Sequence, residues 1–175
     1  MNKLAAIVPT AALLCALAAA AHAEWRLDEG VAIVEPTQTN GTVELLAVMC
    51  GDPVHVELYS RGGPVLPDGD AAAKAEYFYL PGKVRAMVDG QPFPLAAGAS
   101  DETVVLFAEG TKAENYMAPL RADFIEAIKS GRELTLGFDV TPASGADGSP
   151  FETTATFPLE GSRGMIDQAL AGCGK

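Results

Sequence analysis

The chain has 175 residues, with 23 acidic against 12 basic side chains and a formal net charge of −11. This acidity argues against a nucleic-acid partner, whose phosphates require Lys and Arg, and against adsorption to anionic lipid. It leaves a basic partner or simple solubility as explanations, and solubility is the simpler of the two. The length suits one domain, which can bury a core without a metal or several disulfides.

Residues 1–23 have the pattern of a secretory signal peptide. Lys3 precedes an apolar run over 4–20, and the run ends in Ala21-His22-Ala23, with small residues at the two positions that signal peptidase recognises. Such a run beside a cleavage site favours a removable leader over a membrane-spanning helix. We therefore predict export to an oxidising compartment and a single mature domain over 24–175 without a transmembrane segment.

The first part of the mature chain has the two-residue alternation of β-strands. Residues 43–50 are apolar on both faces except for Glu44, which is typical of a strand near the middle of a sheet or between layers. After a Gly51-Asp52-Pro53 turn, residues 54–59 alternate apolar and polar side chains. The pattern predicts a hairpin whose second strand is half-buried.

An aromatic cluster follows a predicted loop. Residues 64–75 contain Pro, Gly and Asp without any period, which indicates a loop. Tyr77, Phe78 and Tyr79 then stand together in a strand-like segment. Core packing is the ordinary role of such aromatic residues, and a partner-binding groove is the alternative, because aromatic side chains mark interfaces when they are exposed.

A second hairpin is predicted around Asp89-Gly90, a strong turn signal. Residues 84–88 alternate before the turn, and the return strand over 91–95 contains Pro92 and Pro94. Since proline cannot donate a hydrogen bond to a strand ladder, we expect the return strand to be short or to lie at a sheet edge.

The remainder alternates strands with two helical segments. Residues 103–108 are a buried-type strand, 133–138 a half-buried one, and 141–150 a loop. A helix is predicted over 118–130, closed by Gly131. Its apolar stripe has helical spacing and consists of Met117, Leu120, Phe124 and Ile128, with Ile125 beside it.

The C-terminal segment predicts one more strand and a final helix. In residues 151–159, every second side chain from Phe151 to Leu159 lies on one face, which is mainly apolar. Ser162 is the predicted N-cap of the helix. Cys173 lies on the apolar stripe of this helix, so we expect its sulfur to point inward. The whole pattern predicts a mainly antiparallel β-sandwich-like domain with two short helices, one of them C-terminal.

Cys50 and Cys173 are the two cysteines that remain after removal of the leader. An even number of cysteines in an exported protein favours one structural disulfide. Free thiols or a redox pair are the alternatives. Redox cysteines usually lie close in sequence, and no C-x-x-C motif is present.

His55 is the only histidine of the predicted mature chain, and Glu57 follows it on the same side of a strand. The two side chains could transfer protons or bind a metal, and the alternative is an ordinary surface histidine. Zinc prefers several nitrogen or sulfur ligands, the chain has no G-x-S-x-G motif, and Asp68-Gly69-Asp70 lacks the remaining ligands of a calcium loop. We therefore predict no catalytic residue, cofactor or metal.

Several short segments form a recognisable set. They are Leu46-Ala47-Val48-Met49-Cys50, Val88-Asp89-Gly90-Gln91-Pro92, Phe157-Pro158-Leu159-Glu160-Gly161-Ser162, Met165-Ile166-Asp167, Leu170 and Cys173. Together they resemble small exported proteins of Gram-negative bacteria, namely the VasI/TagO-like accessory proteins of type VI secretion and, as a second match, the invasion-associated locus B family. The resemblance implies a disulfide-tied periplasmic β-domain without known catalytic residues.

These observations favour a non-catalytic periplasmic accessory or binding protein with a protein partner in the Gram-negative envelope. A link to a secretion or virulence system is the finer expectation. The candidate partner surface comprises Tyr77, Phe78, Tyr79 and His55. The alternatives are a small hydrolase that uses His55 as its base, and a small-ligand carrier that uses the aromatic cluster.

Overall fold

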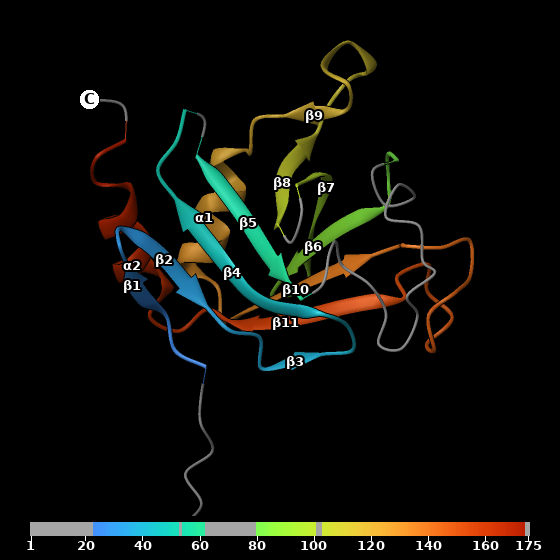
Figure 1. The fold of residues 1–175 in the computed structure, drawn as a ribbon, viewed down its shortest axis with the longest axis horizontal. Coiled ribbons are helices and arrows are strands. Elements are labelled where there is room, and N and C mark those ends of the chain that lie inside the picture. Colours follow the sequence, from blue (N-terminus) through green and yellow to red (C-terminus); the bar gives the residue numbers. More distant parts are fainter. Residues whose placement is uncertain (1–22, 53, 62–79, 101–102, 174–175) are drawn as a thin grey trace, which may run out of the picture.

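The computed structural model describes residues 23–52, 54–61, 80–100 and 103–173. Within them, eleven strands form one antiparallel sheet in the order β1-β2-β4-β5-β8-β7-β6-β10-β11-β3, with β9 paired to β8 (Figure 1). The strands are β1 Arg26–Asp28, β2 Val31–Val34, β3 Gln38–Thr39, β4 Val43–Met49, β5 His55–Ser60, β6 Val84–Val88, β7 Gln91–Ser100, β8 Thr103–Glu109, β9 Met117–Ala118, β10 Glu133–Phe138 and β11 Thr153–Pro158.

The sheet folds over on itself, which gives the sandwich-like architecture that the sequence predicts. In Figure 1, β4 and β5 cross in front of β10 and β11. Leu46 and Leu58 from the front strands and Leu134 and Phe157 from the back strands are fully buried in one hydrophobic core. Successive side chains along each strand point to opposite faces, so one face of the sheet lies inward and the other outward.

Two helices pack against each other and against this core. They are α1 Ala122–Ser130 and α2 Ser162–Leu170. α1 buries Phe124 and Ile128, and α2 buries Ile166 and contacts β1, β2 and β4. Figure 1 shows α1 behind β4 and β5, so neither helix covers the front of these strands. None of the described helices is long and apolar enough to cross a lipid bilayer.

The first helix begins later than predicted. Instead of a helix from 118, Met117 and Ala118 form β9, which pairs with the end of β8. The residue before a proline is restricted to extended conformations, so Pro119 keeps Ala118 out of the helix. Gly131 follows the last helical residue, as predicted.

The prediction that the return strand is short or at an edge is wrong. β7 has ten residues and lies between β6 and β8. Its pairing with β8 begins only at Leu95, so Pro92 and Pro94 lie in the half of the strand that pairs with β6 alone. Prolines fit there because their missing N–H groups can face the side without a partner strand. The turn at Asp89-Gly90 is confirmed, with φ of 48° and 86°.

Ser162 is not the N-cap of the last helix. Gly161 takes that position with φ of 82°, a conformation that favours glycine. Ser162 is fully buried, and its hydroxyl donates a hydrogen bond of 2.8 Å to the carbonyl of Ile128. The hydroxyl therefore links α2 to α1 instead of closing the first turn of its own helix.

The disulfide between Cys50 and Cys173 is present, with a Cα–Cα distance of 5.3 Å. It connects the residue after β4 to the turn after α2. The expectation that Cys173 lies on the apolar stripe of the last helix is wrong, because α2 ends at Leu170 and Cys173 lies in the turn that follows. Cys50 is exposed and Cys173 is half-buried. Both residues lie beyond the ends of their elements, where the chain leaves the core.

Residues 1–22 of the predicted leader, the predicted loop over 64–75 and the aromatic cluster Tyr77, Phe78 and Tyr79 lie outside the described residues. Close to the start of the described chain, Trp25 is buried and donates its Nε1–H to the carbonyl of Pro158 at 2.7 Å. This hydrogen bond anchors the N-terminal segment to the end of β11.

Candidate functional site

The outward side of β5 carries His55, Glu57 and Tyr59, because the side chains between them point into the core. Register with β4 places Met49 opposite His55 and Leu45 opposite Tyr59. Both are half-buried apolar side chains. The polar side chains of β5 therefore lie beside apolar neighbours on β4.

Apolar side chains also lie beside β5 on its other neighbour, β8. Val105 of β8 lies opposite Glu57, and Thr103 lies opposite Tyr59. Phe107 also points outward, since Leu106 and Ala108 on either side of it are buried in the interior. β8 thus adds two more half-buried apolar side chains to this surface.

Gly98 of β7 lies beneath the side chains of Phe107 and Met117. A Cβ atom at Gly98 would lie 3.4 Å from Cε2 of Phe107 and 3.6 Å from Sδ of Met117. The phenyl ring and the thioether therefore pack directly over this glycine. Alanine at this position would make ordinary van der Waals contact with both, whereas a longer side chain would have to displace them.

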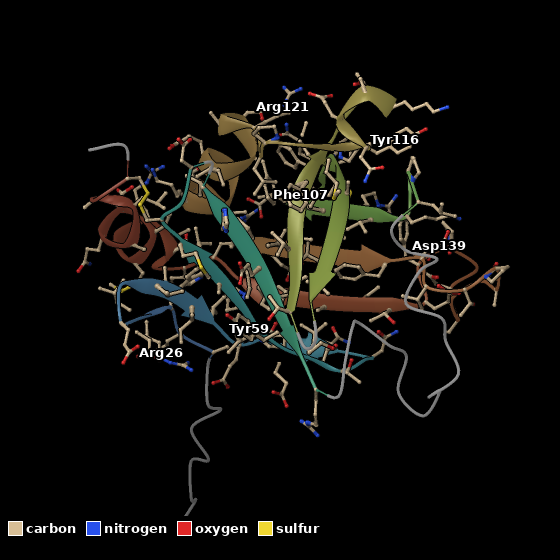
Figure 2. The ribbon with its side chains drawn as sticks, turned by 45° about the horizontal axis from the view of Figure 1, so that its top comes forward. Arg26, Tyr59, Phe107, Tyr116, Arg121 and Asp139 are labelled. Carbon is tan, nitrogen blue, oxygen red and sulfur yellow. A yellow bond between two sulfur atoms is a disulfide. The ribbon has the colours of Figure 1, made fainter. Side chains whose placement is uncertain are left out.

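We call this surface the β4–β8 outer face. Among the described elements, no helix or strand lies over it in Figure 1, and Figure 2 shows Tyr59 on β5 and Phe107 on β8. Tyr59 is 37% exposed, whereas most large apolar side chains in the described part of the chain are buried or half-buried. The face consists of Leu45, Ala47, Met49, His55, Glu57, Tyr59, Gly98, Thr103, Val105, Phe107 and Met117.

Glu57 is the acidic group at the centre of the β4–β8 outer face. Its side chain is only 14% exposed, and its Oε1 lies 3.6 Å from Nδ1 of His55. The hydroxyl of Tyr59 donates a hydrogen bond of 3.4 Å to Oε2. Within the described part of the chain, no Lys or Arg forms an ion pair with this carboxylate.

The pKa of Tyr59 reports on this arrangement. Burial raises the pKa of the Tyr59 hydroxyl above its ordinary value, and the negative charge of Glu57 raises it further. We expect Glu57→Gln to bring the pKa part of the way back, because the neutral amide no longer opposes formation of the phenolate. An ultraviolet absorbance titration measures this change. Glu133→Gln, on β10, is the control and is expected to leave the Tyr59 titration unchanged. An unchanged titration curve for Glu57→Gln would contradict the contact between Glu57 and Tyr59.

A hollow of about 410 Å³ adjoins the outer face at Gly98 and Met117. Leu80, Pro81 and Tyr116 line its other side. Its lining is largely apolar, so it suits an apolar side chain of a bound molecule. The hollow and the β4–β8 outer face share Gly98 and Met117 and therefore form one continuous surface.

A separate cleft of about 260 Å³ lies between the start of β7 and the start of α1. Its charged residues include Arg121 and Asp123, which form an ion pair of 2.6 Å. Each of these side chains already has an oppositely charged partner. The exposed carboxylate of Glu109 also lines this cleft.

The structure brings together His55 and Glu57, as the sequence suggests. Within the described chain, the polar contact of His55 is with Glu57, and no hydrogen bond joins His55 to a serine, threonine or cysteine. The described residues also contain no cluster of three metal-ligating side chains.

The sequence reasoning missed Phe107, Met117 and Gly98 as surface residues. The available signal was that residues 103–108 have apolar side chains on both faces. We interpreted this pattern as burial on both sides, although it also occurs in a strand that buries one face and exposes an apolar surface on the other.

Comparison with known proteins finds no match, since no protein-family model, curated protein or solved structure is similar to this chain.

Proposed function

We propose that this protein is a non-catalytic binding protein of the bacterial cell envelope and that it binds a protein partner on the β4–β8 outer face. One observation carries the proposal: half-exposed apolar side chains from β4, β5, β8 and β9 meet on a face that no described element covers. Contiguous apolar surfaces of this kind mark interaction sites in soluble proteins.

The composition of the face supports a protein partner. Phe107, Tyr59, Met49 and Met117 belong to the residue types that are enriched in protein interfaces. Charged residues are depleted at the centres of interfaces, and Glu57 is the acidic exception here. The adjoining apolar hollow offers a place for one anchoring side chain of the partner.

Location in the periplasm is part of the proposal. It is supported by the leader pattern over 1–23, and the disulfide is compatible with an oxidising compartment. An accessory role in secretion or virulence is the finer proposal, and it rests on the resemblance to the VasI/TagO-like proteins. The hydrolase alternative is less well supported, because no hydrogen bond among the described residues joins His55 to a serine, threonine or cysteine.

Replacing Phe107 with Asp is expected to weaken partner binding at least about tenfold. The change places an unpaired carboxylate in the middle of the interface, where its desolvation is unfavourable. Leu27→Asp is the matched control, because Leu27 is also an exposed apolar residue, 41% accessible, but lies on β1.

The measurement compares proteins captured from envelope extracts by the wild type and by both variants. Circular dichroism verifies that each variant is folded. We expect the captured partner to be lost with Phe107→Asp and retained with Leu27→Asp. Equal capture by all three proteins would contradict the proposed docking face.

A further inference from the structure

We infer that the partner places the side chain of a lysine or arginine over Glu57, with an apolar residue about four positions away that enters the hollow at Gly98. The inference rests on the proposed function, because it specifies the chemistry of the partner on the β4–β8 outer face. It follows from the charge at the centre of the face and from the register of three strands.

Among the residues that the structure describes, no lysine or arginine forms an ion pair with the carboxylate of Glu57. On β4 the facing side chain is Ala47, and on β8 it is Val105. On its own strand, Glu57 has His55 at 3.6 Å and the neutral hydroxyl of Tyr59 at 3.4 Å. A carboxylate has about four acceptor positions, so these two neighbours leave room for an additional donor.

Docking of a partner would remove the water that still reaches this carboxylate. A buried carboxylate without a cation is strongly unfavourable, whereas one that is paired and hydrogen-bonded is tolerated. A purely apolar partner would therefore be rejected at Glu57. A partner that presents Lys or Arg there would be accepted, and the net charge of −11 would favour the approach of such a basic segment.

Strand register sets the spacing within the partner. Glu57 pairs with Val105, and Val105 pairs with Gly98, so these three residues form one row across β5, β8 and β7. Two strand spacings separate Glu57 from Gly98, which is about 10 Å. In an extended chain, residues four positions apart point to the same side and lie about 13 Å from each other. With the long side chain of Lys or Arg taking up the difference, one segment can therefore reach both the carboxylate and the hollow.

Short synthetic peptides test this inference on the exported, oxidised protein. The first probe is acetyl-Thr-Lys-Thr-Thr-Thr-Leu-Thr-amide, and the second carries norleucine in place of lysine. Nuclear magnetic resonance titration of the labelled protein reports which backbone amides shift and how tightly each peptide binds. We expect the lysine peptide to shift amides of β4, β5 and β8 and to bind at least about tenfold more tightly than the norleucine peptide.

Substitution of the carboxylate supplies the matched variant. Glu57→Gln is expected to remove the preference for lysine, and Glu133→Gln, on β10, is expected to retain it. Equal binding of both peptides to the face would overturn the inference but leave the docking face intact. If neither peptide shifts these amides, the inference is also overturned. The comparison of partner capture by the wild type and by Phe107→Asp then tests the docking face independently.

Sedimentation of the free protein tests a different occupant of the face. A dimer that dissociates in the Phe107→Asp variant would make a second copy of the chain the partner. That result would overturn the inference, whereas a monomer in both cases agrees with it.

Discussion

Removal of the disulfide by the double substitution Cys50→Ser, Cys173→Ser is expected to lower the free energy of unfolding by about 4–5 kcal/mol. The bridge joins residues 123 positions apart, so it restricts nearly the whole described chain in the unfolded state. It also fixes the end of α2 beside β4. Urea unfolding monitored by circular dichroism, on the oxidised wild type and on the variant, measures the difference.

Reduction of the wild type provides the control. Because Cys50 is exposed, dithiothreitol should reach the bridge without prior unfolding, and reduced wild type should unfold like the double-serine variant. The variant itself should not respond to the reductant. A difference in stability below about 1 kcal/mol would show that the bridge contributes little, against the expectation for so long a loop.

Replacing Lys83 with Met is expected to destabilise the fold by about 3 kcal/mol. Nζ of Lys83 lies 2.6 Å from Oδ2 of Asp139, whose side chain is only 5% exposed (Figure 2). Oδ1 of the same carboxylate has no hydrogen-bond partner among the described residues. Loss of the ammonium group would therefore leave a buried negative charge without its cation.

A double-mutant cycle isolates this effect. In the background of Asp139→Asn, which removes the negative charge, Lys83→Met should reduce stability far less than it does in the wild type. Urea unfolding of all four proteins gives the coupling between the two side chains. Equal losses in the two backgrounds would show that the lysine contributes through packing alone.

The local part of the fold was predictable because strand alternation is a local property. The alternation in residues 54–59 and 133–138 and the turn at Asp89-Gly90 identified their elements correctly. The conformational restriction that Pro119 imposes on the preceding residue is equally local, but the helical spacing of Met117 concealed it.

The candidate site was not predictable, because it depends on the order of the strands in space. Glu57, Val105 and Gly98 form a row only after β8 inserts between β5 and β7. Neither composition nor periodicity specifies which strands pair over such separations. The buried pair of Lys83 and Asp139 was missed for the same reason, since its members are 56 residues apart.

The central claim is that the β4–β8 outer face binds a protein partner, and site-specific photo-crosslinking tests it most directly. Benzoylphenylalanine replaces Phe107 in one protein and Leu27 on β1 in another, and both are irradiated in living cells. The account predicts a defined crosslinked product from position 107 that disappears when Glu57→Lys is added, and none from position 27. The same product from both positions, or no product from position 107, would contradict it.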